Sequence, residues 1–259
     1  MNDARPSSTD ASTPAAGRRT RPVIAIDGPA GAGKSTLAAH LARRFGFLNL
    51  ETGAMYRALA LKAIECDLDF DEEAPLLALA EDTSIRLEPQ AEGNRVLLDG
   101  IDVSRRVRDT DVTAAASRVS VHPRLRAWMV DQQRALGSSG GIVMEGRDIG
   151  TTVFPDAEVK IFLDAAPEVR SNRRFRQNVF ATAPSQAVAD TTNDEQQREA
   201  QKALLEEMRE RDRRDRTRAE SPLRPADDAV VLDSTAMELP EVLARAEEIV
   251  LSHLTSQAE

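Results

Sequence analysis

The sequence predicts an α/β fold in which a parallel sheet is covered by helices on both faces. Short apolar runs, of the length of buried strands, alternate with longer segments in which apolar residues recur at helical spacing. The expected strands lie at 23–26, 47–50, 142–144, 159–163 and 230–232. Strands that alternate with helices pair in parallel, and such sheets bind ligands at the carboxyl ends of their strands.

The expected helices follow from the same periodicity. A glycine-rich turn follows the strand at 23–26, and after it Leu37, Leu41 and Phe45 recur at helical spacing. Thr52 is expected to cap the next helix, because its hydroxyl can accept a hydrogen bond from the first turn. Further helices are expected near 109–120 and 123–136, from Pro167 to about 180, over 194–218 and over 239–254.

Three segments depart from this alternation. Residues 84–103 contain Leu98-Asp99-Gly100-Ile101, a two-residue hairpin signal, and predict a small antiparallel sheet as an insert. Residues 1–21 are rich in Ser, Thr, Ala, Pro and Arg without an apolar stretch, so we expect a disordered tail and not a signal peptide. Residues 181–193 are polar and are expected to form a loop.

Composition excludes several classes of protein. The 259 residues contain 43 acidic and 34 basic side chains, a net charge of -9, which argues against non-specific binding of nucleic acid. Aromatic residues make up 3%, which leaves few rings to stack on bases. The single cysteine, Cys66, favours a reducing, cytoplasmic location. Widely spaced histidines argue against a zinc site, and no apolar run is long enough to span a membrane.

Residues 28–35 carry the strongest functional signal. Gly28-Pro29-Ala30-Gly31-Ala32-Gly33-Lys34-Ser35 fits the pattern G-x-x-x-x-G-K-[ST], between an expected strand and an expected helix. Backbone N–H groups of such a loop cradle phosphates, the lysine reaches the outer phosphates and the serine hydroxyl ligates Mg²⁺. The alternative is a glycine-rich turn without a ligand. GTPases, ATPases, nucleotide kinases and transporters share this loop.

The absence of two sequence patterns argues against GTPases and motor ATPases among the classes that share this loop. No asparagine is followed by lysine, so the guanine-reading motif of GTPases is missing. The strand ends at Glu145 and Asp164 do not match the strand-end carboxylates of motor ATPases well.

Arginines gather in four further places. Arg57 follows the second strand, and Arg147 stands between glycines after the third. In the charged helix, Arg211, Asp215 and Arg218 form one stripe, and Arg209, Arg213 and Arg216 form a neighbouring one. One stripe could face a ligand while the other faces water. A fourth group is Arg170, Arg173, Arg174 and Arg176, on a mobile lid or a solvated helix. The alternatives are a surface arginine for Arg57, a structural ion pair for Arg147 and a solvated helix face with ion pairs for the charged helix.

Together these runs resemble cytidylate kinases of the bacterial type, a family of nucleoside monophosphate kinases. The resemblance covers about residues 22–254 and rests on 27–36, Thr52-Gly53-Ala54-Met55-Tyr56-Arg57, Gly146-Arg147-Asp148-Ile149-Gly150-Thr151, 153–157 and Arg211-Asp212-Arg213-Arg214-Asp215-Arg216. It implies a P-loop NTPase-type fold over 22–259, with a five-stranded core at 22–51, 137–166 and 219–259. A monophosphate-binding region with the insert would span 52–136, and a lid region 167–218.

The resemblance also implies a reaction and residue roles. ATP would phosphorylate CMP or dCMP with Mg²⁺, and the chain would act as a monomer. ATP would bind at Gly28, Pro29, Ala30, Gly31, Ala32, Gly33, Lys34, Ser35 and Thr36, with Ser35 helping to hold Mg²⁺. Ser117, Arg126 and Asp148 would read cytosine, and Arg211 and Asp215 would hold the sugar. Arg57, Arg147 and Arg218 would bind the acceptor phosphate, Thr52 would contribute to the substrate site, and Lys34, Arg173 and Arg174 would serve the transferred phosphoryl group.

The chain departs from the family pattern at two positions, and two other functions remain open. Glu145 stands where aspartate is frequent, and Thr52 where serine is common. One alternative is a kinase for another acceptor, such as UMP, and the other is a P-loop regulator that binds ATP to switch a partner. An arginine-rich RNA-binding module conflicts with the net charge of -9.

Overall fold

The computed structural model describes residues 19–90, 93–182 and 194–256. Its centre is a parallel sheet in the order β2-β6-β1-β7-β8. These strands are β1 (Val23–Asp27), β2 (Leu48–Glu51), β6 (Ile142–Gly146), β7 (Val159–Asp164) and β8 (Val230–Asp233). The five strands coincide with the five apolar runs, and the predicted fold class is confirmed.

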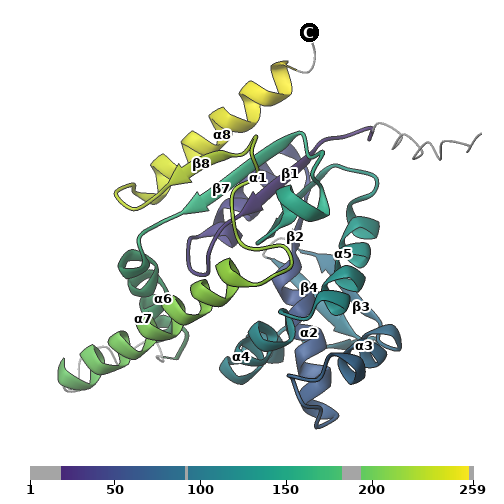
Figure 1. Cartoon of the computed structure of the whole chain (residues 1–259). Coiled ribbons are helices and arrows are strands. Elements are labelled where there is room, and N and C mark those ends of the chain that lie inside the picture. Colours follow the sequence, from purple (N-terminus) through teal and green to yellow (C-terminus); the bar gives the residue numbers. More distant parts are fainter. Residues whose placement is uncertain (1–18, 91–92, 183–193, 257–259) are drawn as a thin grey trace, which may run out of the picture.

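The three central strands are buried on both faces, and their alternate residues face opposite layers. In β1, Val23 and Ala25 pack with α2 (Thr52–Glu65), α4 (Thr110–Val119) and α5 (Pro123–Gly137). Ile24 and Ile26 pack on the other side with α1 (Lys34–Phe45) and α8 (Leu239–Ser256). Figure 1 shows α8 along one side of the sheet and α2, α4 and α5 along the other.

The insert is a three-stranded antiparallel sheet of β3 (Ile85–Pro89), β4 (Asn94–Leu98) and β5 (Ile101–Asp102). Asp99 and Gly100 have φ of 50° and 83°, as the two-residue turn requires. The side-chain amide of Asn94 joins the insert to the edge of the main sheet. It donates to the carbonyl oxygen of Asn49 over 2.7 Å and accepts from the N–H of Glu51 over 2.8 Å. The carboxyl end of β2 is thereby held in place.

Two charged helices, α6 (Pro167–Thr182) and α7 (Asp194–Thr217), pack against each other. They form the pair at the lower left of Figure 1. Both agree with the ranges expected from the sequence. Among the described helices, none is both long and apolar enough to cross a membrane.

The structure corrects the sequence predictions in three places. Helix α3 (Glu73–Glu81) was not predicted, although Leu76 is fully buried in the core. Thr52 is the first residue of α2 and not its cap, and its hydroxyl donates to the carbonyl oxygen of Glu145 over 2.7 Å.

The third correction concerns the end of the expected tail. Arg19 donates to the carbonyl oxygen of Asp156 over 2.7 Å, and Arg21 donates to that of Gly46 over 2.7 Å. Residues 19–21, which were expected to belong to the disordered tail, are therefore held against the rest of the chain. The rest of the expected tail, residues 1–18, and residues 183–193 of the expected loop lie outside the described residues.

Candidate active site

The loop between β1 and α1 has the backbone of a phosphate cradle. Gly28, Gly31 and Gly33 have φ of 150°, 76° and 102°. A Cβ atom at Gly28 would lie 2.0 Å from the carbonyl oxygen of Leu163 in β7, so a side chain does not fit there. Gly33 precedes α1, and no described side chain caps the first N–H groups of that helix. These N–H groups and the helix dipole form an anion-binding site.

Lys34 lies buried at the base of this loop. Its Nζ donates to the carbonyl oxygen of Pro29 over 2.8 Å. Burial lowers the pKa of Lys34 to about 7, and the charges of Arg147 and Arg211 act in the same direction against the opposing pull of Glu145 and Asp27. The ammonium group is therefore short of negative charge, which the phosphates of a nucleotide would supply.

Two glutamates meet beside the loop, at the ends of neighbouring strands. Glu51 and Glu145 are register partners in β2 and β6. Burial raises the pKa of Glu145 to about 7, the charge of Glu51 adds to the shift, and Lys34 and a hydrogen bond from Ser35 oppose it. Burial also opposes ionisation of Glu51, but Arg57, 2.5 Å away, outweighs burial and lowers its pKa. Glu145 Oε1 has no hydrogen-bond partner among the described residues.

Asp27, at the end of β1, fixes the loop that follows β6. Its carboxylate accepts a hydrogen bond from the N–H of Ile149 over 2.8 Å and another from that of Gly150 over 2.7 Å. Both residues belong to the short π-helix Ile149–Val153. Burial raises the pKa of Asp27 to about 6, against these two hydrogen bonds. The preceding residues, Arg147 and Asp148, thereby take a defined position relative to the P-loop.

Arg147 reaches across to α7. Its Nε donates to Asp215 Oδ2 over 2.9 Å. Arg218 lies beside the same carboxylate, with Nη1 3.9 Å from Asp215 Oδ1 and Nη2 4.0 Å from Asp148 Oδ1. Only 4% of the Arg218 side chain is exposed. Two segments that lie far apart in the sequence thus share one buried network of charges.

A second buried ion pair adjoins this network. Arg126 Nη2 donates to Asp148 Oδ2 over 2.5 Å, and its guanidinium lies over the ring of Tyr56, 5.6 Å from the centroid. Ser117 is buried, and its Oγ finds no hydrogen-bond partner in the described part of the chain. These groups could recognise a polar planar ligand, because they offer donors and a carboxylate acceptor in a site shielded from water.

Around Arg211, in the middle of the candidate site, positive charge exceeds negative charge. Burial lowers the pKa of Arg211 to about 10, Arg147, Arg57 and Arg174 shift it further down, and Asp215 opposes them. Its Nε has no hydrogen-bond partner among the residues described. A buried cation without enough acceptors is costly, and an anionic ligand would remove that cost.

The structure brings together most of the predicted site residues. The electrostatic neighbours of Lys34 and Arg211 place Lys34, Arg57, Arg147 and Arg211 in one cluster, which the ion pairs of Asp215 and Asp148 extend to Arg218 and Arg126. Ser35 and Thr36 are exposed at the first turn of α1. Arg209, Arg213 and Arg216, the other stripe of α7, are exposed.

Arg173 is placed differently from the expectation. Its guanidinium donates to Ser234 Oγ over 3.0 Å and to the carbonyl oxygens of Ser234 and Ala32 over 2.9 Å and 3.3 Å. It therefore ties α6 to β8 and to the back of the P-loop. Arg174 is exposed, and its charge is felt at Arg211.

Sequence reasoning assigned no individual role to Asp27 and Glu51, and it named Arg170 only as one of four arginines on a mobile lid or a solvated helix. Asp27 and Glu51 each end a core strand, and that position is the signal that could have found them. Arg170 offered no such signal, because a charged residue in a charged helix reads as a surface group until its burial is known.

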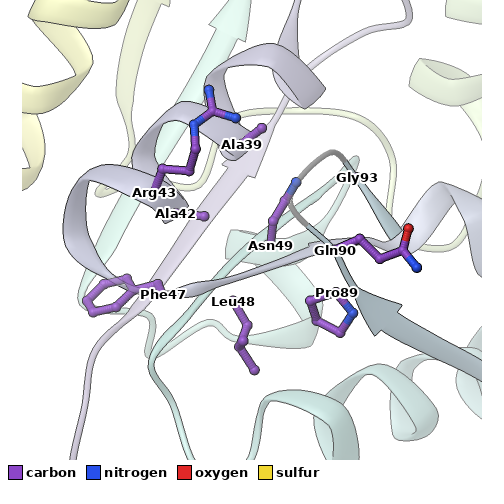
Figure 2. Close-up of a pocket in the computed structure, with 9 residues that line it drawn as sticks. All are labelled: Ala39, Ala42, Arg43, Phe47, Leu48, Asn49, Pro89, Gln90 and Gly93. Atoms are coloured by element: carbon purple, nitrogen blue, oxygen red, sulfur yellow. The ribbon is translucent and has the colours of Figure 1, made fainter. Parts of the chain in front are cut away.

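A separate cavity of about 210 Å³ lies between α1, the start of β2 and the insert (Figure 2). It is lined by Ala39, Ala42, Arg43, Phe47, Leu48, Asn49, Pro89, Gln90 and Gly93. None of these residues belongs to the P-loop or to the cation cluster, so this cavity is distinct from the candidate active site.

Comparison with known proteins agrees with this arrangement. The family model for cytidylate kinase matches residues 24–252. The cytidylate kinase of Geobacillus thermodenitrificans is 47% identical over 227 residues, 88% of this chain and 95% of its own. That of Pelotomaculum thermopropionicum is 49% identical and covers 86% and 92% of the two chains. That of Vibrio cholerae is 44% identical and covers 90% and 97%.

Solved structures resemble the chain more distantly. The shikimate kinase of Acinetobacter baumannii, in complex with shikimate, covers 93% of this chain and 97% of its own at 13% identity, with a TM-score of 0.38. That likeness is too low to bear on function. The family match and the identity of the relatives over nearly their whole length are decisive, and the chain belongs to the cytidylate kinase family.

Proposed function

We propose that this chain transfers the terminal phosphoryl group of ATP to CMP or dCMP and releases ADP with CDP or dCDP. The observation that carries the proposal is the cluster of Lys34, Arg57, Arg147 and Arg211, which come from four separate stretches of chain. Two nucleotides brought phosphate to phosphate carry a large negative charge. Phosphoryl transfer needs alignment and positive charge on the spreading negative charge, and little covalent help from the protein.

The donor side is the P-loop. Lys34 would exchange its bond to the Pro29 carbonyl oxygen for the outer phosphates of ATP, which also restore its positive charge. The exposed Ser35 hydroxyl and the unpartnered Oε1 of buried Glu145 fit Mg²⁺, because hydroxyl and carboxylate oxygens are the ligands that this ion prefers. When bound there, Mg²⁺ supplies charge neutralisation at the transferred phosphoryl group.

The acceptor phosphate would bind to Arg57, Arg147 and Arg218. All three guanidiniums are held by carboxylates here, Arg57 by Glu51 and the other two by Asp215. An incoming phosphate would replace part of these contacts. The Thr52 hydroxyl donates to Glu145, so we assign Thr52 to the positioning of α2 and not to donation toward a phosphate.

The sugar and the base would lie beside this phosphate. Arg211 and Asp215 would contact the sugar hydroxyls, and Ser117, Arg126 and Asp148 the cytosine. Cytosine carries an exocyclic amino donor that the Asp148 carboxylate can accept, whereas uracil presents an oxygen there. A buried polar group left unpaired costs about 1–3 kcal/mol, which corresponds to a preference of about ten- to a hundredfold.

The arginines of α6 divide between two roles. Arg174 is exposed beside the cluster and remains our choice for the transferred phosphoryl group. Arg173 is occupied by Ser234 and Ala32, so we assign it to the support of the P-loop in this conformation.

A coupled assay of ADP release tests the proposal. ATP is offered with CMP, dCMP, UMP, AMP and GMP in turn, and kcat/KM is measured for each. We expect the values for CMP and dCMP to exceed those for AMP and GMP by at least about tenfold, from the base contacts. A preference for UMP over CMP would favour the other kinase hypothesis. ATP hydrolysis that no monophosphate accelerates would favour the regulator.

A further inference from the structure

Arg170 is the arginine whose position the phosphoryl transfer does not explain. It lies in α6 and is only 1% exposed. All three of its nitrogens donate hydrogen bonds. Nε donates to the carbonyl oxygen of Ala165 over 2.8 Å, Nη1 to that of Ala30 over 2.9 Å and Nη2 to Asp212 Oδ2 over 2.5 Å. A guanidinium this deeply buried is stable only when paired, so its partners define its role.

The first of these partners is the outer side of the P-loop, which α6 and α7 hold at three consecutive residues. Arg170 binds the carbonyl oxygen of Ala30, and Arg173 binds that of Ala32. Between them, a Cβ atom at Gly31 would lie 2.8 Å from Met208 Cε of α7 and 3.3 Å from Arg170 Cβ. The shape of the P-loop therefore depends on where these two helices sit.

The second partner, Asp212, belongs to α7 next to the proposed sugar-binding residues. It follows Arg211 directly and precedes Asp215 by three residues. Asp212 is 8% exposed, and its Oδ1 has no hydrogen-bond partner within the described ranges, so the contact with Arg170 is its main compensation. The Arg170 guanidinium thus links the P-loop to Asp212, and Asp212 lies less than one helical turn from Arg211 and Asp215.

We propose that Arg170 and Asp212 are positioning residues that couple the binding of the two nucleotides. The inference rests on the proposed function. Phosphates that order the P-loop fix Ala30 and Arg170, and Arg170 fixes Asp212 and with it the direction of Arg211 and Asp215. Each nucleotide then binds a site that the other has already ordered, so each raises the affinity of the other by the same factor.

Calorimetric titration tests this coupling. The Kd of a non-hydrolysable ATP analogue is measured on the full chain without CMP and with saturating CMP. For the wild type we expect CMP to lower that Kd by about tenfold, within the usual range of coupling between sites. In Asp212→Asn we expect the factor to fall below about twofold, because the amide keeps the shape but not the charge that holds Arg170. Arg170→Lys should lose part of the coupling, because an ammonium cannot bind all three partners at once.

The chain offers a matched control. Arg209 of α7 binds Glu168 of α6 over 2.6 Å, so this ion pair joins the same two helices. Both side chains are 55% exposed, and neither is among the contacts to the P-loop. Arg209→Gln should leave the coupling factor at the wild-type value.

Three outcomes overturn the inference: no coupling in the wild type, unchanged coupling in Asp212→Asn, or an equal loss in Arg209→Gln. A merely structural role would lower the melting temperature and the fraction of binding-competent protein while leaving the coupling factor unchanged. Thermal unfolding without nucleotide and the fitted stoichiometry record that separately.

The proposed function can fail independently. If the wild type does not bind or phosphorylate CMP, the titration with the ATP analogue alone still tests the donor side of the link. There, Asp212→Asn should weaken the analogue at least about threefold more than Arg209→Gln, and equal affinities would overturn the link itself.

Discussion

Helix α7 and Arg218, the residue that follows it, carry two stripes of charge that are alike in composition and opposite in environment. Arg211, Asp215 and Arg218 face the carboxyl end of the sheet, and the side chains of Asp215 and Arg218 are 8% and 4% exposed. Arg209, Arg213 and Arg216 face solvent. Arg213 pairs with Glu210 on its own helix over 2.7 Å, and Arg209 with Glu168.

The contrast teaches that the balance of charge, and not the number of arginines, distinguishes a binding surface from a solvated face. In the outer stripe each arginine meets a carboxylate, Arg209 that of Glu168, Arg213 that of Glu210 and Arg216 that of Asp164, and exposed pairs of this kind contribute little to stability. In the inner stripe Arg211 meets mainly other arginines, and burial lowers its pKa. A site that keeps positive charge uncompensated is built for an anion that is not part of the chain.

Replacing one arginine in each stripe should give the largest difference in activity between the two stripes. Arg211→Ala is expected to lower kcat/KM for CMP by about 100- to 1000-fold, because it removes both the proposed contact with the sugar and positive charge from the cluster around the transferred phosphoryl group. Arg213→Ala should change kcat/KM by less than about twofold, as a surface substitution away from the site. Steady-state assays of both variants check this. Similar losses in the two variants would contradict the division of α7 into two stripes.

Asp148 tests whether the inner network also reads the base. Asp148→Asn keeps a partner for Arg126 but presents either an acceptor or a donor to the ligand. The ratio of kcat/KM for CMP to that for UMP is expected to fall by about ten- to a hundredfold. The ratio is insensitive to a general loss of stability, which affects both substrates equally. An unchanged ratio would remove Asp148 from base recognition.

The pH dependence of stability should have opposite signs at Asp27, the buried end of β1 beside the P-loop, and at Glu210, on the exposed face of α7. Burial raises the pKa of Asp27 from 3.8 to about 6, so its contribution is full below about pH 4 and is lost as pH rises through 6. The free energy of unfolding of the wild type minus that of Asp27→Asn should therefore fall by about 2 kcal/mol between pH 4 and pH 7. Urea unfolding at each pH measures this difference, and a flat difference would contradict the raised pKa.

For the outer stripe the direction reverses. A hydrogen bond from Arg213 lowers the pKa of Glu210, so its small contribution is present near neutral pH and is lost as pH falls. The difference between the wild type and Glu210→Gln should accordingly shrink, not grow, toward low pH.

The smallest effect is expected for the outer ion pairs themselves. Arg213→Ala should leave the thermal midpoint unresolved from that of the wild type at physiological salt, because the exposed pair is screened. Differential scanning calorimetry at low and high salt checks this. A clear, salt-independent drop in the thermal midpoint would mean that the outer stripe contributes to stability, contrary to the difference drawn between the two stripes.

Local patterns were enough to predict the strands, because each is a short apolar run, and the hairpin at Asp99-Gly100, because both residues tolerate positive φ. They missed α3, because Pro75-Leu76-Leu77-Ala78-Leu79-Ala80 is apolar without a clear period. The two stripes of α7 followed from helical geometry. The side on which each would lie did not, because it depends on packing against distant strands.

The partners of the site residues also lay beyond the sequence. Arg147 and Asp215 are 68 positions apart, and Arg170 reaches Ala30 across 140. No short-range rule pairs such residues. The family resemblance supplied candidate roles for Arg147 and Asp215, but not the ion pair that joins them.

The close approach of Gly28 to the carbonyl oxygen of Leu163 has a consequence for how such an enzyme changes over time. At Gly28 the P-loop rests against the main chain of β7. Substitutions of side chains in β7 can alter the hydrophobic layers while the P-loop backbone at Gly28 keeps its position. The position of the donor phosphates thus tolerates such changes in the core, whereas Gly28 itself leaves no room for a side chain.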